Sequence, residues 1–294
     1  MFKVFLTGSS GFIGKYLHCF FKDKLTINIF DRTLEILITD NIVIHLAGKA
    51  HDLKSTSNPE EYYQVNTELT KSVFDAFLTS EAKIFITLSS VKAVTDDLQG
   101  ELTEEHIPNP ITHYGKSKLL AEQYILSKEI PEGKRVYILR PCMIHGPGNK
   151  GNLNLLYQLV SKGIPWPLGA FKNKRSFCSI DNLMFIIKEL IEREDIPSGV
   201  YNVADDVALS TNEVISILAE SQNKKPNIWN FSKSLIESAA KIGDVLKLPL
   251  NEERLQKLTN SYIVSNQKIK TAIGKSLPVS SKVGLLKTFK SFKN

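Results

Sequence analysis

The chain has 294 residues, of which 42% are hydrophobic and 23% charged, a composition typical of an ordinary globular protein. Its three cysteines (Cys19, Cys142 and Cys178) have no paired spacing, which argues against a disulfide framework or a metal site and favours a reducing compartment. No uncharged apolar run reaches the roughly 18 residues that a membrane helix needs, and glycines interrupt the apolar N-terminal stretch, so we expect a cytoplasmic protein without an integral membrane segment.

The formal net charge of +6 belongs to the C-terminal part of the chain. From Arg254 onward there are nine Lys or Arg and no acid; subtracting these from the 37 basic residues leaves 28, against 31 acidic residues. We therefore expect no nucleic-acid partner. Apolar and basic residues alternate at helical spacing from Lys282 to Lys293, which favours a helix whose apolar stripe lies on its own domain, with a membrane-surface helix as the alternative.

Six short β-rich runs are almost continuously apolar, as expected of strands covered on both faces. They are Lys3–Leu6, Ile27–Phe30, Ile42–Leu46, Ile84–Leu88, Val136–Leu139 and Val200–Val203. Segments with apolar residues three or four positions apart separate several of them, which indicates helices. This alternation predicts an α/β fold with a doubly wound, Rossmann-type parallel sheet.

The stretch "FLTGSSGFIGKYLHCFF" connects the first strand to the first helix. Gly8, Gly11 and Gly14 stand in it with the spacing Gly-x-x-Gly-x-x-Gly. Side chains there would keep a pyrophosphate from the backbone N–H groups and the positive end of the helix, and Gly14 also lets helix and sheet pack closely. The turn predicts a dinucleotide site, although a glycine trio alone also fits a purely structural turn.

An acidic residue, Asp31, directly follows the second strand. Its carboxylate can accept hydrogen bonds from the adenosine ribose and would repel a 2′-phosphate, which favours NAD; the neighbouring Arg32 keeps NADP as an alternative. Only a short stretch of chain separates Asp31 from His45, and a parallel neighbour needs a long crossover. We therefore expect "TLEILITD" to be a short helix or connector, with loss of the edge strand and a thinner adenine pocket.

The catalytic candidates follow the fourth run. The strand "KIFITLSS" ends in Ser89 and Ser90, where an open parallel sheet binds ligands, and "HYGKSK" places Tyr114 and Lys118 on one helix face. A tyrosine base must lose about three pKa units, or roughly 4 kcal/mol, to work near pH 7. The Lys118 ammonium or an oxidised nicotinamide ring could supply this. Without the glycine turn, such a pair would more often be a solvated helix face.

Several motifs occur in the order found in extended short-chain dehydrogenases/reductases. They are "TGSSGFIG", "HLAGKAH", "LSSVK", "YGKSK", "LRPCMIHGPG", "RSFCSIDN" and "VYNVADD". Up to about residue 206 the chain resembles the nucleotide-sugar epimerases, dehydratases and 4-keto-sugar reductases of polysaccharide biosynthesis.

The resemblance implies roles for individual residues. Ser90, Tyr114 and Lys118 would be catalytic, with Lys118 also holding the nicotinamide ribose. The cofactor set it implies is Gly8, Ser10, Gly11, Phe12, Ile13, Gly14, Asp31, Arg32, Leu46, Ala47, Gly48, Tyr114, Lys118 and Pro141. The substrate set it implies is Ser90, Lys92, Asn152 and Arg175, with the guanidinium of Arg175 on the nucleotide diphosphate.

The pattern loosens after about residue 150, where "GIPWPLGAFKNKR" forms a Pro/Gly-rich loop and the sequence beyond Ala204 is typical of mainly helical, polar structure. We predict an NAD(P)-binding domain of residues 1–150, to which residues 178–204 return. Residues 151–177 and 205–294 would form a smaller, mixed substrate-binding lobe. Helices at Glu60–Leu78 and Tyr114–Ser127 could form a homodimer contact, as is common in the family that the chain resembles.

Departures from the family pattern narrow the expected reaction. Val91 and Lys92 follow Ser90 where dehydratases carry an acidic pair, so 4,6-dehydration is not expected; Met143 replaces an asparagine of several epimerases, so the sugar stays open. The sequence favours a cytoplasmic NAD-dependent 4-epimerase of a UDP-hexose or UDP-N-acetylhexosamine. The alternatives are an NAD(P)H-dependent nucleotide-4-keto-sugar reductase and, more remotely, a non-catalytic dinucleotide sensor.

Overall fold

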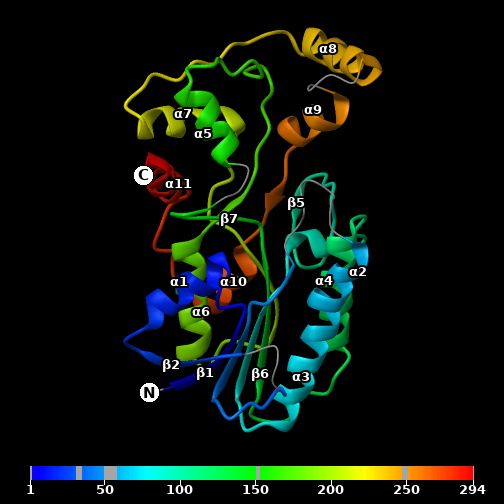
Figure 1. Ribbon diagram of the computed structural model, residues 1–294, viewed down its shortest axis with the longest axis vertical. Helices are drawn as coiled ribbons and strands as arrows, with labels where there is room; N and C mark the ends of the chain where they lie inside the picture. The colour runs from blue at the N-terminus through cyan, green and yellow to red at the C-terminus, as the bar shows by residue number, and fades with distance from the viewer. Residues whose placement is uncertain (1, 31–34, 50–57, 150–152, 247–250, 294) are drawn as a thin grey trace.

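The computed structural model describes residues 2–30, 35–49, 58–149, 153–246 and 251–293. A parallel sheet with helices on both faces occupies one end of the elongated molecule, and a mainly helical lobe occupies the other (Figure 1). The chain crosses between the two ends more than once, so residues distant in sequence meet where they join.

The main sheet has six parallel strands in the order β2-β1-β3-β4-β6-β9. Its strands are β1 (Phe2–Thr7), β2 (Leu25–Ile29), β3 (Ile42–His45), β4 (Ile84–Leu88), β6 (Arg135–Pro141) and β9 (Gly199–Val203). All six strands expected from the sequence are present, and the predicted α/β, doubly wound class is confirmed.

The sheet is covered on both faces because successive residues of each strand turn apolar side chains to opposite sides. Val4 and Leu6 of β1 pack into a cluster with α1 (Phe12–Phe21) and α6 (Ile180–Glu192), while Phe5 between them packs into a second cluster with α3 (Leu69–Thr79). Burial on both faces explains why these strands are continuous apolar runs in the sequence rather than alternating ones.

The sheet ends at β2, as the sequence analysis expected. Residues 35–41 form a connector in which Ile38 is buried against the α3 face, and Asp40 accepts a 2.6 Å hydrogen bond from Asn28 of β2. Within the described part of the chain no strand pairs with the outer side of β2. The wall that a further strand would give the adenine pocket is therefore missing there.

The remaining helices and short strands build the mainly helical lobe, which we call the upper lobe, and the connections between it and the main sheet. They are α2 (Pro59–Tyr63), a π-helix η1 (Gln64–Glu68), a 3₁₀ turn η2 (Val91–Ala93), β5 (Glu101–Leu102), α4 (His113–Leu126), β7 (Met143–His145), α5 (Leu153–Ser161), β8 (Phe177–Ser179), α7 (Thr211–Ser221), α8 (Lys233–Leu246), α9 (Glu252–Thr259), β10 (Ile263–Val264), α10 (Gln267–Ile273), α11 (Ser281–Lys290) and η3 (Ser291–Lys293). β5 pairs with β10, and β7 with β8, so both short sheets tie the lobe to the main sheet. The division into domains at residue 150 stays a prediction.

The basic C-terminal segment packs on its own protein. Leu285 and Phe289 of α11 are fully buried in a third apolar cluster with α5 and α7. Lys287 pairs with Asp181 at 2.7 Å, and Lys282 with Glu220 at 2.9 Å, so part of the local positive charge is neutralised within the fold. The first of the two alternatives for this helix is thus confirmed. Among the described residues, no helix is long and apolar enough to cross a membrane.

Candidate active site

In the turn between β1 and α1 the backbone passes so close to other backbone atoms that two positions have no room for a side chain. Gly8 has a φ of +73°, and a Cβ there would lie 2.5 Å from the backbone nitrogen of Ala47. At Gly14 a Cβ would lie 2.4 Å from the carbonyl oxygen of Gly8. The expected close packing at Gly14 is confirmed, but a side chain at Gly8 would first strike protein backbone rather than a ligand.

Gly11 is the glycine of this turn that faces open space. It is exposed, and a Cβ there would meet only the Gly8 carbonyl oxygen, at 3.3 Å. As the N-cap of α1 it has no side chain to accept from the first N–H groups of the helix, those of Phe12 and Ile13. Free N–H groups at a positive helix end suit a phosphate, so the turn fits the pyrophosphate of a dinucleotide.

The loop after β3 brings the glycine turn towards α4. The N–H of Ala47 donates to the hydroxyl of Thr7 at 3.1 Å, and a Cβ on Gly48 would lie 3.1 Å from Nζ of Lys118. Leu46 is half-buried and Gly48 exposed. Two further predicted residues frame the same end of the sheet: Ser10, exposed in the glycine turn, and Pro141, at the carboxyl end of β6.

Asn66, which the sequence analysis did not single out, holds this loop in place. Its Oδ1 accepts from the N–H of Lys49 at 2.8 Å, and its Nδ2 donates to the Ser117 hydroxyl at 3.0 Å and to the Lys49 carbonyl oxygen at 3.2 Å. It is fully buried on the π-helix η1, a kind of local bulge found often at functional sites. A polar amide beside the apolar Val65/Leu69/Val73 stripe was the only sequence signal for it.

A buried histidine extends this network to the first strand. His45 Nδ1 lies 2.8 Å from the Thr7 hydroxyl and its Nε2 lies 2.9 Å from the Thr70 hydroxyl, which donates to the Asn66 carbonyl oxygen at 2.8 Å. Burial, with a smaller effect of Lys118, lowers the pKa of His45 to about 3. The ring is therefore neutral, and it links β1, β3 and η1 through hydrogen bonds alone.

The N-terminus of α4 packs against the turn that follows β4. The Thr112 hydroxyl caps the helix by accepting from the N–H of Gly115 at 3.2 Å, and a Cβ on Gly115 would lie 2.3 Å from the Lys92 carbonyl oxygen. This contact brings Ser90 close enough to Tyr114 for its hydroxyl to lower the pKa of the phenol. The role of the Ser90 hydroxyl in catalysis stays a prediction.

The charges around Tyr114 differ from the expectation in one respect. Burial raises the pKa of Tyr114 above its usual value, and the hydrogen bond from Ser90 offsets only part of that rise. Burial also lowers the pKa of Lys118 to about 8, against a smaller raising effect of Glu122. The lowered pKa expected for Tyr114 is therefore not found in the protein alone, where the phenol stays protonated at neutral pH; the effect of an oxidised nicotinamide on it stays a prediction.

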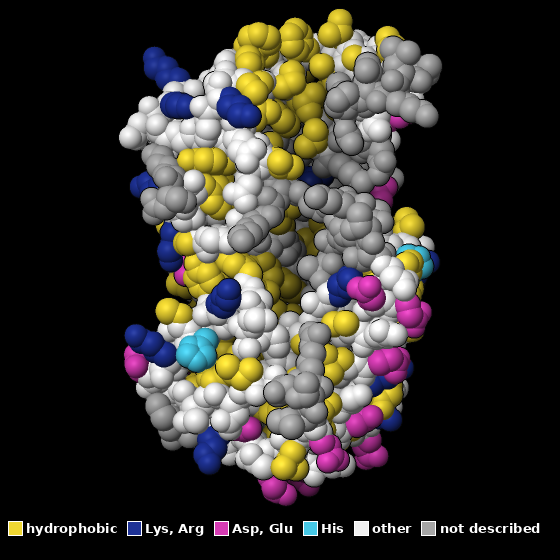
Figure 2. Space-filling view, viewed as in Figure 1, with side chains coloured by type: hydrophobic (Ala, Val, Ile, Leu, Met, Phe, Trp, Pro, Cys, Tyr) yellow, Lys and Arg dark blue, Asp and Glu magenta, His cyan; other side chains and the backbone are white. Residues whose placement is uncertain are grey.

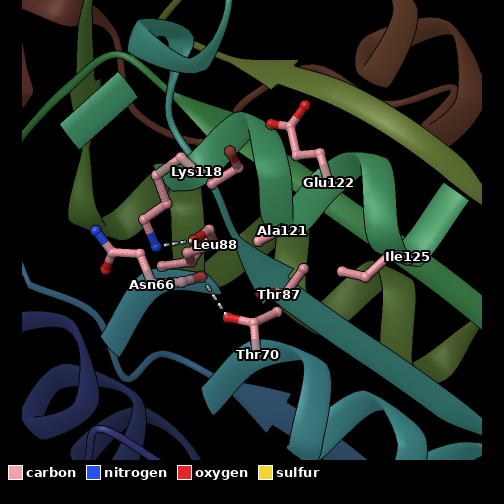
Figure 3. A pocket seen from close by; sticks show the side chains of 9 residues that line it. Asn66, Thr70, Thr87, Leu88, Lys118, Ala121, Glu122 and Ile125 are labelled. Carbon is pink, nitrogen blue, oxygen red and sulfur yellow. Dashed lines mark hydrogen bonds between the residues drawn. The ribbon is translucent and has the colours of Figure 1, made fainter. Parts of the chain in front are cut away.

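A hydrogen bond to the main sheet fixes the position of the Lys118 side chain. Its Nζ donates a 2.9 Å hydrogen bond to the carbonyl oxygen of Leu88, at the end of β4 (Figure 3). A cavity of about 10 Å³, lined by Asn66, Thr70, Ser89, Lys118 and Glu122 among others, lies on this side and matches the smallest space that holds one water. The Ser89 hydroxyl is buried there without a partner among the described residues.

Lys92 and Arg175 approach one another near Tyr262. The Lys92 ammonium lies 4.4 Å from the centre of the Tyr262 ring and donates to the Asp96 carbonyl oxygen at 3.0 Å. Burial lowers the pKa of Lys92, and the nearby Arg175 lowers it further, against a raising effect of Asp96.

Tyr262 is a site residue that the sequence analysis missed. Its hydroxyl donates to the carbonyl oxygen of Thr95 at 2.7 Å and lies 3.2 Å from the carbonyl oxygen of Val91, in the turn that follows Ser90. It comes from a segment near the other end of the chain, where the resemblance to the family is faint, so neither spacing nor motif pointed to it.

Most of the predicted residues therefore meet at the carboxyl ends of the parallel strands. The glycine turn, the loop after β3, Ser90, Tyr114 and Lys118 form one group, and Lys92, whose N–H donates to the Ser90 hydroxyl, connects this group to Arg175. Asp31, Arg32 and Asn152 lie outside the described residues. The arrangement supplies a protonated phenol, a buried ammonium and an anion-binding helix end at one end of the main sheet.

Comparison with known proteins agrees with this geometry. The family model described as "NAD dependent epimerase/dehydratase family" matches residues 4–204. The chain is 32% identical over 257 residues to UDP-glucose 4-epimerase of Vibrio cholerae, covering 76% of each chain. It is 26% identical over 242 residues to GDP-6-deoxy-D-mannose reductase of Pseudomonas aeruginosa, covering 74% of this chain and 79% of the relative.

Among solved structures, MoeE5 in complex with UDP-glucuronic acid and NAD has the same fold. The two chains superpose with a TM-score of 0.76 at 21% identity, over 99% of each. Similarity at this level extends to both ends of the molecule.

Proposed function

The chain belongs to the NAD-dependent epimerase/dehydratase family, and we propose that it is a nucleotide-sugar 4-epimerase that acts by transient oxidation at C4. Membership makes it an NAD-dependent enzyme, which removes the non-catalytic sensor from consideration. The relative with 32% identity is a UDP-glucose 4-epimerase, which supports a UDP-hexose or UDP-N-acetylhexosamine as substrate.

The observation that carries the proposal is the placement of Ser90 beside the Tyr114 phenol, where it acts on the pKa of that group, one helical turn from Lys118. NAD, held at the glycine turn, would supply the acceptor and donor of the hydride that leaves C4 and returns to the other face of the keto sugar. Tyr114 removes the proton of the C4 hydroxyl and later returns it, while Ser90 holds the reacting oxygen by a hydrogen bond. Lys118 supplies a positive charge beside the phenol.

Because the pKa of Tyr114 is raised, the phenol needs a further positive charge before it can remove a proton from the substrate. In the protein alone the phenol keeps its proton, so proton removal needs more positive charge than Lys118 provides. An oxidised nicotinamide carries such a charge, and one unit charge about 4 Å away is worth about 4 kcal/mol in a half-buried site. Tyr114 would then act as a base only while oxidised cofactor is bound, which protects the site from idle proton exchange.

The substrate would lie towards the upper lobe, where Arg175 and Lys92 place two cations near each other. The fork of Arg175, whose Nε donates to the Asn260 carbonyl oxygen at 3.0 Å, suits diphosphate oxygens. Asn152 is proposed to face the sugar. We also place the enzyme in the cytoplasm, because its three cysteines are free and Cys19 is exposed, which suits a reducing environment.

A homodimer through α3 and α4 is part of the proposal. These helices lie side by side on one face of the sheet, and α4 exposes the apolar Leu120 and Leu126 (Figure 1). Two copies joined there would form a four-helix contact.

A second candidate, a nucleotide-4-keto-sugar reductase, is favoured by one specific observation. The sheet has no strand beyond β2 in its described part, so the adenine end of the cofactor site lacks a wall. A reductase must release oxidised cofactor after each turnover, and a thin pocket helps that exchange. An epimerase keeps its cofactor. The relative that is 26% identical is a GDP-6-deoxy-D-mannose reductase, and this similarity also supports the reductase.

The test is the cofactor requirement of the purified enzyme. For the epimerase, NAD co-purifies, and a panel of UDP-sugars gives C4 epimers by NMR without added NADH. A deuterium placed at C4 of the substrate stays at C4 of the product, because hydride returns within the same site. An empty protein that consumes NADH in equal amount with a 4-keto sugar, and that leaves UDP-hexoses unchanged, would establish the reductase instead.

A further inference from the structure

The outer end of the upper lobe is built from two segments that pair through their backbones. The N–H of Trp166 donates to the Asn227 carbonyl oxygen at 2.8 Å, and the N–H of Trp229 donates to the Trp166 carbonyl oxygen, also at 2.8 Å. Trp166 is buried in the lobe's apolar cluster and Ile228 packs against it. Because side chains alternate along an extended segment, Trp229 and Phe231 point outward.

These outward side chains form an exposed apolar patch. Trp229 is 50% exposed and Phe231 40%, and their rings contact each other at 5.8 Å between centroids. Leu235, at the start of α8, is 58% exposed, and Ile164 is 49% exposed. We call these four residues the lobe edge. Figure 2 shows hydrophobic side chains gathered at this end of the molecule, with Lys or Arg side chains beside them. Single exposed apolar residues are common, but two exposed aromatic rings in contact, with further exposed apolar residues on the same two segments, favour a binding surface.

The two segments that carry the lobe edge contain charged residues of one sign only. Residues 159–172 and 222–235, which build it, contain five lysines and no Asp or Glu, although the chain as a whole is mixed. The lysines are Lys162, Lys172, Lys224, Lys225 and Lys233. Lys233 lies 5.6 Å over the ring of Phe171, so one ammonium is held against the apolar surface.

An open hollow beside the patch combines both properties. It has a volume of about 220 Å³ and is lined by Val160, Ile164, Ile215, Lys224 and Lys225, among others. Its lining combines apolar side chains with Lys225 and with Lys224, whose Nζ donates to the Ser161 carbonyl oxygen at 2.8 Å, and so it complements a molecule with an anionic head and an apolar chain. An acidic peptide would satisfy the lysines but not the apolar side chains.

We propose that the lobe edge docks on the surface of an anionic phospholipid bilayer. Tryptophan and phenylalanine insert at the level of the head groups, and the lysines meet the negative surface potential, which attracts basic residues near the surface. The patch lies at the end of the molecule opposite the main sheet, so docking leaves the NAD-binding end free (Figure 1). This inference goes beyond the proposed reaction and does not depend on it.

The test uses the two tryptophans as opposite reporters. The chain has two, Trp229 at the lobe edge and Trp166, which is 4% exposed. With vesicles of equal parts phosphatidylglycerol and phosphatidylcholine we expect co-sedimentation, a blue shift of the fluorescence and quenching by brominated lipid. With phosphatidylcholine alone we expect none of these. Trp229→Phe should keep binding but lose the fluorescence response, since only Trp166 remains.

Charge and apolar variants separate the two parts of the surface. Lys224→Glu with Lys225→Glu should weaken vesicle binding at least tenfold, and raising salt from about 0.15 to about 0.5 M should weaken it in the wild-type protein, as surface electrostatics require. Trp229→Ser with Phe231→Ser should abolish it. Ile107→Ser, which removes an isoleucine that is 90% exposed elsewhere, is the matched control and should leave binding unchanged.

The proposal is overturned if the wild-type protein fails to sediment with anionic vesicles, or if the lysine and aromatic variants bind as the wild type does. It is also overturned if light scattering shows a dimer that only the lobe-edge variants dissociate, because a second copy would then cover the patch. Circular dichroism of each variant checks that folding is kept. Epimerase assays are not needed for any of these outcomes.

Discussion

The ammonium of Lys118 donates a 2.9 Å hydrogen bond to the carbonyl oxygen of Leu88, so the end of β4 and the middle of α4 are tied together at the candidate active site. The lysine is held in position by the protein alone. Burial at this place lowers its pKa to about 8, which leaves the charge of the site sensitive to pH just above neutrality.

NAD affinity should therefore depend on pH through Lys118. Below about pH 8 the side chain is an ammonium; as pH rises through that value it loses its charge. We expect the NAD dissociation constant to be constant from pH 6.5 to 7.5 and then to rise by up to about tenfold per pH unit. Lys118→Arg, which stays charged, should give a flat profile with reduced turnover. Calorimetric titration from pH 6.5 to 9.5 tests this, and a flat wild-type profile would contradict it.

The glycines of the first turn should separate into two classes. Gly8→Ala combines a φ of +73° with a 2.5 Å backbone clash and should lower the free energy of unfolding by about 2–4 kcal/mol. Gly148→Ala, at φ +79° in open space, is the control for backbone strain and should cost about 1–2 kcal/mol. Gly11→Ala should change stability by less than about 1 kcal/mol yet weaken NAD binding. Urea unfolding measures the free energy of unfolding of each variant, and titration with NAD measures its affinity for the cofactor. Equal stability losses at Gly8 and Gly11 would refute the distinction.

The buried ion pair between Arg140 and Glu122 should be costly to break from one side. Nε of Arg140 donates to Glu122 Oε1 at 3.0 Å, and both side chains are at most 5% exposed. Glu122→Met or Arg140→Met should each lower the free energy of unfolding by about 3–5 kcal/mol, because one charge of the pair loses its partner. The double variant Arg140→Met/Glu122→Met should lose less than either single variant. Additive losses in urea unfolding would count against a coupled pair.

His45 should make folding stability depend on pH in the acid range. Its pKa is about 3 in the fold and 6.5 as the unperturbed value, so the unfolded chain binds more protons between these limits. Stability from the neutral ring is fully present above pH 6.5 and falls as pH decreases towards 3, by about 1.4 kcal/mol per pH unit. His45→Gln should flatten this slope, while His18→Gln, at an exposed position, should not. Parallel slopes for His45→Gln and wild type in urea titrations would exclude the assignment.

The strands and the catalytic helix could be predicted from sequence because their signals are local. Strands buried on both faces are apolar runs, and Tyr114 and Lys118 share a helix face by spacing alone. The missing edge strand followed from chain length, since the stretch between Asp31 and His45 is too short to hold a strand with its crossover.

Contacts between distant residues could not be predicted in this way. Asn66 serves the site through Lys49 and Ser117, which lie 17 and 51 positions away, and Tyr262 reaches it from the far end of the chain. The direction of the Tyr114 pKa shift also depended on burial, which spacing does not reveal. Spacing identifies which side chains can meet, whereas the fold decides what surrounds them.

The measurement that tests the central claim most directly compares Tyr114→Phe with Tyr124→Phe, a change on the exposed side of the same helix, where the hydroxyl bonds Asp75 at 2.8 Å. We expect Tyr114→Phe to bind NAD as the wild type does but to lose about a thousandfold in turnover of the UDP-sugar. Tyr124→Phe should keep both. Turnover of Tyr114→Phe within a few-fold of the wild type, with NAD bound, would contradict the assignment of Tyr114 as the group that moves the proton.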